Sequence, residues 1–258
     1  MTSRSSVGVS RIGAVAVVEL QRPPHNFLDL SVVQQLAVAY EEADANDGVR
    51  AVVLCAQGKS FCAGADFQDP HRSSASGSTS GASLYREALR LYGIRKPVVA
   101  AVQGAAVGGG LGLAVSADFR ITCLEARFSA NFTRIGTHPG FGLTWALPNL
   151  IGINKAELMF YTGRRIGGEQ AVAWGLANEC VPQDQVKERA IALATEIAEC
   201  APLALLAARA TLRSKITDSF VKAVDHEFSV QSQLHLTTDF REGVRAYSER
   251  RPAHFVGR

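Results

Sequence analysis

The sequence lacks several features that would each point to a particular class of protein. Its cysteines form no CxxC pair, so neither a zinc site nor a disulfide framework is expected from Cys55, Cys62, Cys123, Cys180 and Cys200. No apolar stretch reaches the roughly 18 residues of a membrane span, and the N-terminal segment MTSRSSVGVS lacks the apolar run of a signal peptide. These absences predict a cytoplasmic protein with no metal and no membrane partner.

The sequence also lacks a large excess of positive or negative charge. The 27 Lys and Arg residues against 24 Asp and Glu residues leave a formal net charge of +3, and no basic stripe stands out. A nucleic acid is therefore not expected as the main partner, whereas the mildly basic balance suits an anionic small molecule. The length of 258 residues, 47% of them hydrophobic, is typical of a globular protein with one large α/β domain or a domain and a small appendage.

The N-terminal part of the sequence carries a strand–helix–strand pattern. Residues 14–20 and 49–57 are β-branched runs bounded by turn residues, which predicts two buried strands. Residues 31–46 between them have helical spacing, with Ser31 as the expected N-cap. A helix between two strands predicts that the strands pair in parallel.

Strand repeats stop near residue 182, which divides the chain into two regions. Residues 1–182 are predicted to form the core, and residues 183–258 have the spacing of successive helices. A helical tail of this length is expected to pack on neighbouring subunits; the alternative is that it closes the core of its own chain. Residues 69–83, rich in Ser and Gly, are expected to form a loop, either a solvated insertion or a lid beside a pocket.

The segment VGGGLGLA (107–114) concentrates four glycines behind an apolar strand pattern at 96–104. It fits neither a phosphate loop, which needs a following Lys, nor the glycine spacing of a dinucleotide fingerprint, so nucleotide and NAD-dependent functions are disfavoured. The remaining interpretation is a strand, a tight turn and a helix that starts near Gly109. The unpaired N–H groups of such a helix start can bind an oxygen that becomes an anion. The segment GKSFCAGADF (58–67) offers the same chemistry, and the two together predict an oxyanion hole.

Taken together, the two segments resemble a known family. SFCAGADF followed by KPVVAAVQGAAVGGGLGLAVSADFRI resembles the crotonase superfamily, that is, the enoyl-CoA hydratase/isomerase family. The resemblance continues through RFSANFTRIGTHPGFG and YTGRRIGGEQAVAWGLANECVP to EGVRAYSERRPAHF near the end of the chain. It implies an α/β fold built as a crotonase (ClpP-like) spiral of ββα repeats over residues 1–182, with a helical C-terminal region (183–258) that makes homotrimers or dimers of trimers.

The resemblance also implies a ligand and a set of site residues. The ligand is an acyl-CoA thioester, as substrate or bound molecule, with no further cofactor. Ala65 and Gly109 take the positions of the two oxyanion-hole donors, whose shared role is to stabilise a thioester enolate. For Asp66 a helix cap is the alternative to a role at CoA, and for Arg250 the alternative is a solvated surface position. The positions matching CoA contacts are Ala63, Gly64, Asp66 and Arg250.

Two positions depart from the family pattern. Hydratases of the family carry two glutamates that hold and activate the attacking water, and those positions here are Gly112 and Phe132. Neither can transfer a proton, so hydratase activity is expected to be weak or absent. His138 is the candidate replacement acid or base; the alternative is a loop histidine bonded to backbone. The sequence therefore predicts an enzyme that processes acyl-CoA thioesters, or alternatively a non-catalytic acyl-CoA-binding carrier.

Overall fold

The computed structural model describes residues 5–67, 78–214 and 218–258. The strands in these ranges are β1 (Val7–Ile12), β2 (Val15–Leu20), β3 (Ala51–Ala56), β4 (Ser60–Cys62), β5 (Val98–Val102), β6 (Ala105–Val107), β7 (Phe119–Thr122), β8 (Arg127–Ser129), β9 (Arg165–Ile166) and β10 (Glu179–Cys180). The helices are α1 (Leu30–Ala45), α3 (Ser78–Tyr92), α4 (Gly109–Ser116), η2 (Asn131–Ile135), α5 (Leu143–Ile151), α6 (Ile153–Thr162), α7 (Gly168–Trp174), η3 (Gln183–Gln185), α8 (Val186–Ala198), α9 (Pro202–Arg213), α10 (Asp218–Leu234) and α11 (Thr238–Glu249).

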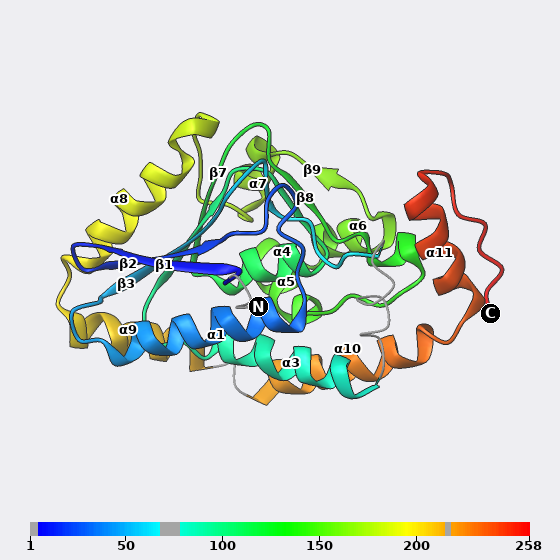
Figure 1. Ribbon diagram of the computed structural model, residues 1–258, viewed down its shortest axis with the longest axis horizontal. Coiled ribbons are helices and arrows are strands. Elements are labelled where there is room, and N and C mark those ends of the chain that lie inside the picture. The colour runs from blue at the N-terminus through cyan, green and yellow to red at the C-terminus, as the bar shows by residue number, and fades with distance from the viewer. Residues whose placement is uncertain (1–4, 68–77, 215–217) are drawn as a thin grey trace.

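The larger sheet has the strand order β1-β2-β3-β5-β7-β10. Its strands are parallel except for β1, which pairs with β2 in antiparallel register. All of β5 and nearly all of β3 are buried, as expected of parallel strands that are covered on both faces. In Figure 1, α8 lies along one side of this sheet and α1 along the other. The predicted strand–helix–strand unit is confirmed, because α1 connects the parallel strands β2 and β3.

The predicted N-cap of that helix is wrong. The helix begins at Leu30, and Asp29 caps it by accepting the Val32 N–H on its carboxylate at 2.9 Å. Ser31 lies inside the first turn, where its hydroxyl accepts a hydrogen bond from the Gln35 side chain at 3.1 Å. Asp and Ser are nearly equivalent caps, so side-chain preference alone could not decide between two residues so close together.

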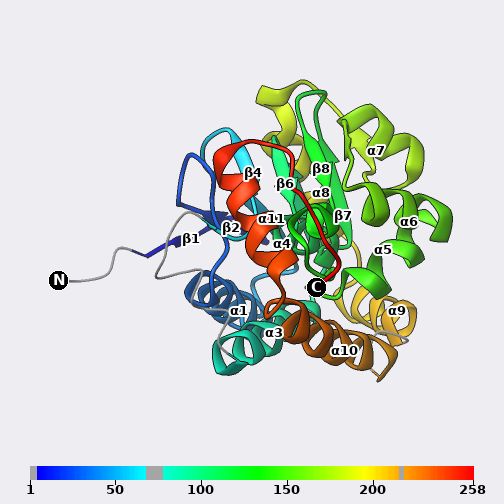
Figure 2. The same ribbon diagram turned by 90° about the vertical axis from the view of Figure 1, so that its right-hand side faces the viewer.

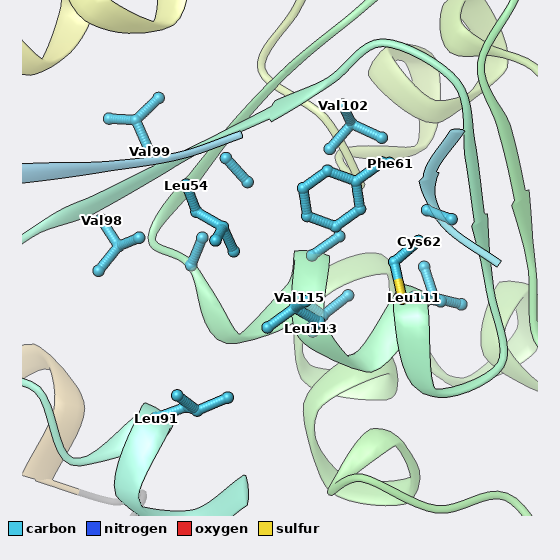
Figure 3. Close-up of a cluster of buried hydrophobic side chains, with 14 of the residues drawn as sticks. Leu54, Phe61, Cys62, Leu91, Val98, Val99, Val102, Leu111, Leu113 and Val115 are labelled. Atoms are coloured by element: carbon cyan, nitrogen blue, oxygen red, sulfur yellow. The ribbon is translucent and has the colours of Figure 1, made fainter. Parts of the chain in front are cut away.

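The smaller sheet has the order β4-β6-β8-β9 and lies beside α4. Strands β4 and β6 are parallel, with Ser60 opposite Ala105, so their carboxyl ends meet at one edge. Figure 3 shows side chains of β3, β4, β5 and α4 gathered in one buried cluster that includes Phe61, Leu111 and Leu113. This cluster fixes α4 against β4, and therefore fixes the position at which α4 begins.

The C-terminal helices pack largely on their own chain. Helix α8 covers the larger sheet, α10 contacts α3 and α5, and α11 contacts η2; Figure 2 shows α11 in front of α4 and the smaller sheet. Helix α9 differs, because none of its residues is buried and Leu203 and Leu212 are each 83% exposed. In the described part of the C-terminal region, α8, α10 and α11 thus cover the core of their own chain and α9 does not; packing on neighbouring subunits stays a prediction.

The loop predicted over residues 69–83 is wrong from residue 78 onward, because helix α3 starts at Ser78. The earlier part of that predicted loop lies outside the described residues.

Among the described helices, none is long and apolar enough by itself to cross a membrane. Only α8 with its η3 turn and α9, bent by 108°, pass that test as a pair.

Candidate functional site

A cavity of about 210 Å³ lies where the two predicted loops meet. Its wall combines the loop after β4, the start of α4, the η2 segment and the turn that follows it, and one face each of α3, α10 and α11. The volume is below the roughly 300–1,000 Å³ of pockets that enclose a drug-sized ligand. A cavity of this size suits one reacting group of a ligand rather than a whole nucleotide-sized molecule.

The two loops come together because they follow neighbouring parallel strands. Gly64 follows β4 with a φ of +83°, a left-handed conformation that L side chains rarely adopt. A Cβ at Gly64 would lie 2.6 Å from the carbonyl oxygen of Val107 and 3.7 Å from the amide nitrogen of Gly109. Only glycine therefore lets the loop after β4 approach the start of α4 so closely.

The loop after β4 is also tied to the segment that precedes α1. The Ala63 N–H donates to the His25 carbonyl at 3.0 Å, and the Leu28 N–H donates to the Gly64 carbonyl at 2.8 Å. Cys62, which precedes this loop, is buried, and burial raises the pKa of its thiol to about 12. Its sulfur is therefore a protonated packing atom rather than a nucleophile.

Ala65 and Gly109 are brought to the same cavity by these loops. Both residues line it, and Gly109 is the first residue of α4. Within the described residues, neither N–H donates a hydrogen bond to another group of the protein. The start of α4 adds the positive end of a helix dipole. Such an arrangement can stabilise negative charge that develops on an oxygen atom placed between the two donors.

The two positions that the family resemblance assigns to the glutamates of hydratases differ in their surroundings. Phe132, in η2, lines the cavity, and its ring lies 3.9 Å from the point that a Cβ on Gly108 would occupy. Gly112 is buried inside α4, and a Cβ there would lie 2.7 Å from Cβ and Cδ1 of Phe141. The aromatic ring of Phe141 therefore fills the space into which a side chain at position 112 would extend. Neither position supplies a carboxyl group.

The turn that carries Phe141 is itself held in place by buried polar groups. Phe141 has a φ of +64°, which is costly for a residue with a large side chain. The next N–H, of Gly142, donates to the buried carboxylate of Glu227 on α10 at 2.7 Å, and the same carboxylate accepts from the N–H and hydroxyl of Thr144. Burial raises the pKa of Glu227, while these hydrogen bonds oppose the rise.

His138 lies outside the lining of this cavity, as far as the described residues define it. Its Nδ1 is 2.7 Å from the carbonyl oxygen of Pro139, and its ring makes an edge contact with His226. Burial lowers the pKa of His138, so the ring is neutral near neutral pH. This position matches the alternative prediction, a loop histidine bonded to backbone, rather than an acid or base at the cavity.

The positions predicted to contact CoA divide into two groups. Ala63, Gly64 and Asp66 line the cavity. Arg250 is exposed at the C-terminal end of α11, with its backbone in the left-handed region, and is not among the described lining residues.

The contribution of the C-terminal helices to the cavity was not predicted from the sequence. Phe228, Gln231, Ser232 and His235 all line it. Residues at i, i+3, i+4 and i+7 lie on one face of a helix, and this spacing was visible in the sequence. The face mixes an aromatic ring with polar groups, however, so it did not stand out from an ordinary helix surface.

Comparison with known proteins places the chain in a class. A family model described as "Enoyl-CoA hydratase/isomerase" matches residues 11–258. A Rhodobacter capsulatus protein named "Probable enoyl-CoA hydratase" is 35% identical over 246 residues, which is 95% of each chain. The "1,2-epoxyphenylacetyl-CoA isomerase" of Escherichia coli is 30% identical over 250 residues, again 95% of each. A solved enoyl-CoA hydratase from Mycobacterium avium subsp. paratuberculosis superposes with a TM-score of 0.88 at 26% identity, covering 98% of this chain and 99% of that one.

The molecule is thus a crotonase-fold protein, with the mixed α/β architecture and parallel sheets of its structural neighbours. The chain belongs to the enoyl-CoA hydratase/isomerase family. The relatives' names include both a hydratase and an isomerase, so membership leaves the reaction open.

Proposed function

We propose that this protein binds an acyl-CoA thioester and stabilises its enolate through the N–H groups of Ala65 and Gly109. The observation that supports the proposal is that both residues, which follow adjacent parallel strands, line one cavity, and that neither N–H donates a hydrogen bond within the described residues. A thioester oxygen accepting both hydrogen bonds gains most when it becomes negatively charged, so the site favours the enolate over the ground state.

We expect hydration to be weak, because no carboxyl group stands at position 112 or 132. Positioned acid and base groups each contribute about 10²–10⁴-fold to a rate, so crotonyl-CoA hydration should be at least about a hundredfold below that of a two-glutamate site. Double-bond isomerisation, decarboxylation or thioester hydrolysis tolerates the missing pair better. Steady-state assays with crotonyl-CoA and longer enoyl-CoAs measure this directly, and ordinary hydratase turnover would contradict it.

Two substitutions at one position test the oxyanion donors. Gly109→Pro removes the N–H, and proline is well tolerated at the first residue of a helix. Gly109→Ala is the matched control, because it keeps the N–H and its Cβ meets only the flexible Leu28 side chain at 3.2 Å. If a reaction is catalysed, the proline variant should lose about 10²–10³-fold in kcat relative to the alanine variant. Equal activity in the two variants would remove Gly109 from the proposed mechanism.

A non-catalytic acyl-CoA-binding protein is the second candidate. The position of His138, outside the cavity and bonded to Pro139, favours it. A carrier would bind acyl-CoAs in titration calorimetry and return every one of them unchanged from long incubation with stoichiometric protein. Conversion of any enoyl-, acyl- or carboxyacyl-CoA in that incubation would rule the carrier out.

We also propose a homotrimer or a dimer of trimers in the cytoplasm. The exposed leucines of α9 support assembly, since Leu203 and Leu212 would otherwise face water. The cysteines are free thiols, three of them buried, which suits a reducing compartment. Light scattering coupled to gel filtration measures the mass, and a monomer would contradict the proposed assembly.

A further inference from the structure

One wall of the cavity is polar, although most of the cavity is apolar. We define the polar wall as Tyr85 of α3 with Gln231 and Ser232 of α10 and His235 just after it. The other lining residues are largely aromatic and aliphatic and include Phe132, Ile135 and Phe141. A pocket evolved only for an unsubstituted alkyl chain has no use for four hydrogen-bonding side chains on one side.

The polar wall is a built arrangement, because its side chains are fixed by other groups. The His235 ring stacks on Phe240 with centroids 4.1 Å apart, and its Nε2 is 3.0 Å from the hydroxyl of the buried Thr137. The Gln231 amide donates to the His138 carbonyl at 2.6 Å, and the Ser232 hydroxyl donates to the Phe228 carbonyl at 2.8 Å. These contacts hold the side chains of Gln231, Ser232 and His235 in place.

These bonds leave one hydrogen-bonding function free on several of the side chains. The Tyr85 hydroxyl has a backbone hydrogen bond with Phe141, but among the described residues nothing accepts its proton. Nothing in the same part of the chain donates to Oε1 of Gln231 or bonds to Nδ1 of His235. Two of the groups are also adjacent, since a Cβ on Gly140 would lie 2.1 Å from the Tyr85 Oη and 2.7 Å from Nε2 of Gln231. The absence of a side chain at Gly140 leaves room for both groups.

The charges at the cavity restrict what this wall can bind. Burial lowers the pKa of His235 and raises that of Tyr85, so both are neutral near neutral pH. No Lys or Arg is among the described lining residues, whereas Asp29 and Asp66 are. A carboxylate on the ligand would therefore meet no cation among these described residues. An uncharged donor and acceptor, such as a hydroxyl, matches the free functions.

Resting on the proposed function, we propose that the ligand's acyl group carries an uncharged hydrogen-bonding substituent, and that the polar wall recognises it. A plain alkyl or phenyl group would strip water from the wall and leave its free functions unpaired. A site built for a hydroxyl rejects an analogue that lacks it much more strongly than an apolar pocket rejects an added methylene.

The test compares matched pairs of acyl-CoAs by titration calorimetry on the full-length protein. The pairs are hexanoyl-CoA with 6-hydroxyhexanoyl-CoA, and phenylacetyl-CoA with 4-hydroxyphenylacetyl-CoA, which place a hydroxyl at different depths. In at least one pair the hydroxylated ligand should bind about tenfold more tightly, the fold-change that one net hydrogen bond supports. Equal or weaker binding of the hydroxylated member in both pairs overturns the inference. If none of the four ligands binds, the proposed function itself fails, and the inference with it.

Variants assign the preference to the polar wall. Tyr85→Phe removes only the hydroxyl, and Gln231→Met replaces the amide with an apolar group of similar length. Each should reduce the ratio of the two affinities, hydroxylated over plain ligand, several-fold. Gln233→Met is the control, because Gln233 is exposed on another face of α10. A preference that survives both wall variants in folded protein would place recognition elsewhere and overturn the assignment. If Gln231→Met fails to fold, Tyr85→Phe decides alone.

Discussion

The packing of Phe141 against Gly112 predicts a stability effect that changes sign with the residue at position 141. A Cβ added at Gly112 would lie 2.7 Å from both Cβ and Cδ1 of Phe141, and 2.9 Å from its Cγ. Carbon atoms in favourable contact are about 3.5–4.0 Å apart, so one side must move by roughly 1 Å. Overpacking of this kind costs about 1–3 kcal/mol, whereas Gly→Ala within a helix contributes about 0.5–1 kcal/mol. Gly112→Ala should therefore destabilise the protein by about 1–2 kcal/mol.

The partner substitution shows whether Phe141 is the cause. Phe141→Gly removes the ring and its Cβ at a position whose φ of +64° suits glycine. In that background Gly112→Ala should stabilise by about 0.5–1 kcal/mol, so the double-mutant cycle should give a coupling of about 2 kcal/mol. Phe141→Ala is the matched intermediate, because it keeps the Cβ that lies 2.7 Å from the added atom. In the Phe141→Ala background, the change in stability caused by Gly112→Ala should lie between its values with Phe and with Gly at position 141.

Urea unfolding followed by the fluorescence of Trp145 and Trp174 measures all of these free energies at fixed protein concentration. The refuting result is a Gly112→Ala single variant that is as stable as the parent protein. It would mean that Phe141 moves aside freely, and that the space for a glutamate at position 112 is not restricted.

Two further predictions concern catalysis and pH. The double variant Gly112→Glu with Phe132→Glu should not raise crotonyl-CoA hydration measurably. Adding Phe141→Gly opens the space, and this triple variant should raise the hydration rate by about 10²-fold or more. A double variant as active as the triple variant would show that Phe141 is no obstacle. Burial lowers the pKa of His235 below its ordinary value of 6.5, so the unfolded chain binds a proton first as pH falls. Its contribution to stability is thus complete above about pH 6.5 and is lost as pH falls toward the lowered pKa. The urea midpoint should therefore fall less between about pH 7.5 and about pH 5.5 in His235→Phe than in the parent protein. The control is His254→Phe, at an exposed histidine, in which the fall should equal that of the parent. An equal fall in the parent and both variants would contradict this account.

Part of the fold and of the site could be predicted from local sequence. Parallel pairing of β2 and β3 followed from a helix between two apolar runs, and the start of α4 at Gly109 followed from the glycine turn. An oxyanion hole from the two glycine segments was predicted from their residues, but the choice of Ala65 and Gly109 came from the family resemblance, because the site requires the β4–β6 pairing of strands far apart in the chain.

Other features depend on packing that no local pattern encodes. Phe141 fills the space beside Gly112 from a turn nearly thirty residues away, and a lone aromatic residue in a loop gives no sign of this. The face of α10 that lines the cavity likewise becomes a wall only once α10 lies beside the turn at Gly140. His138 carries the chemistry expected of an acid or base, but its ring is directed to a backbone carbonyl instead.

The contribution of α10 and α11 to the cavity has a consequence for the order of synthesis. The ribosome completes both sheets, and with them the loops of Ala65 and Gly109, before it makes either of these helices. A nascent chain can therefore present the pair of amide donors while the side of the cavity that holds Gln231 and His235 does not yet exist. Until those helices dock, the end of the cavity at Ala65 and Gly109 would be open to water, so a partly synthesised chain should not retain a ligand there.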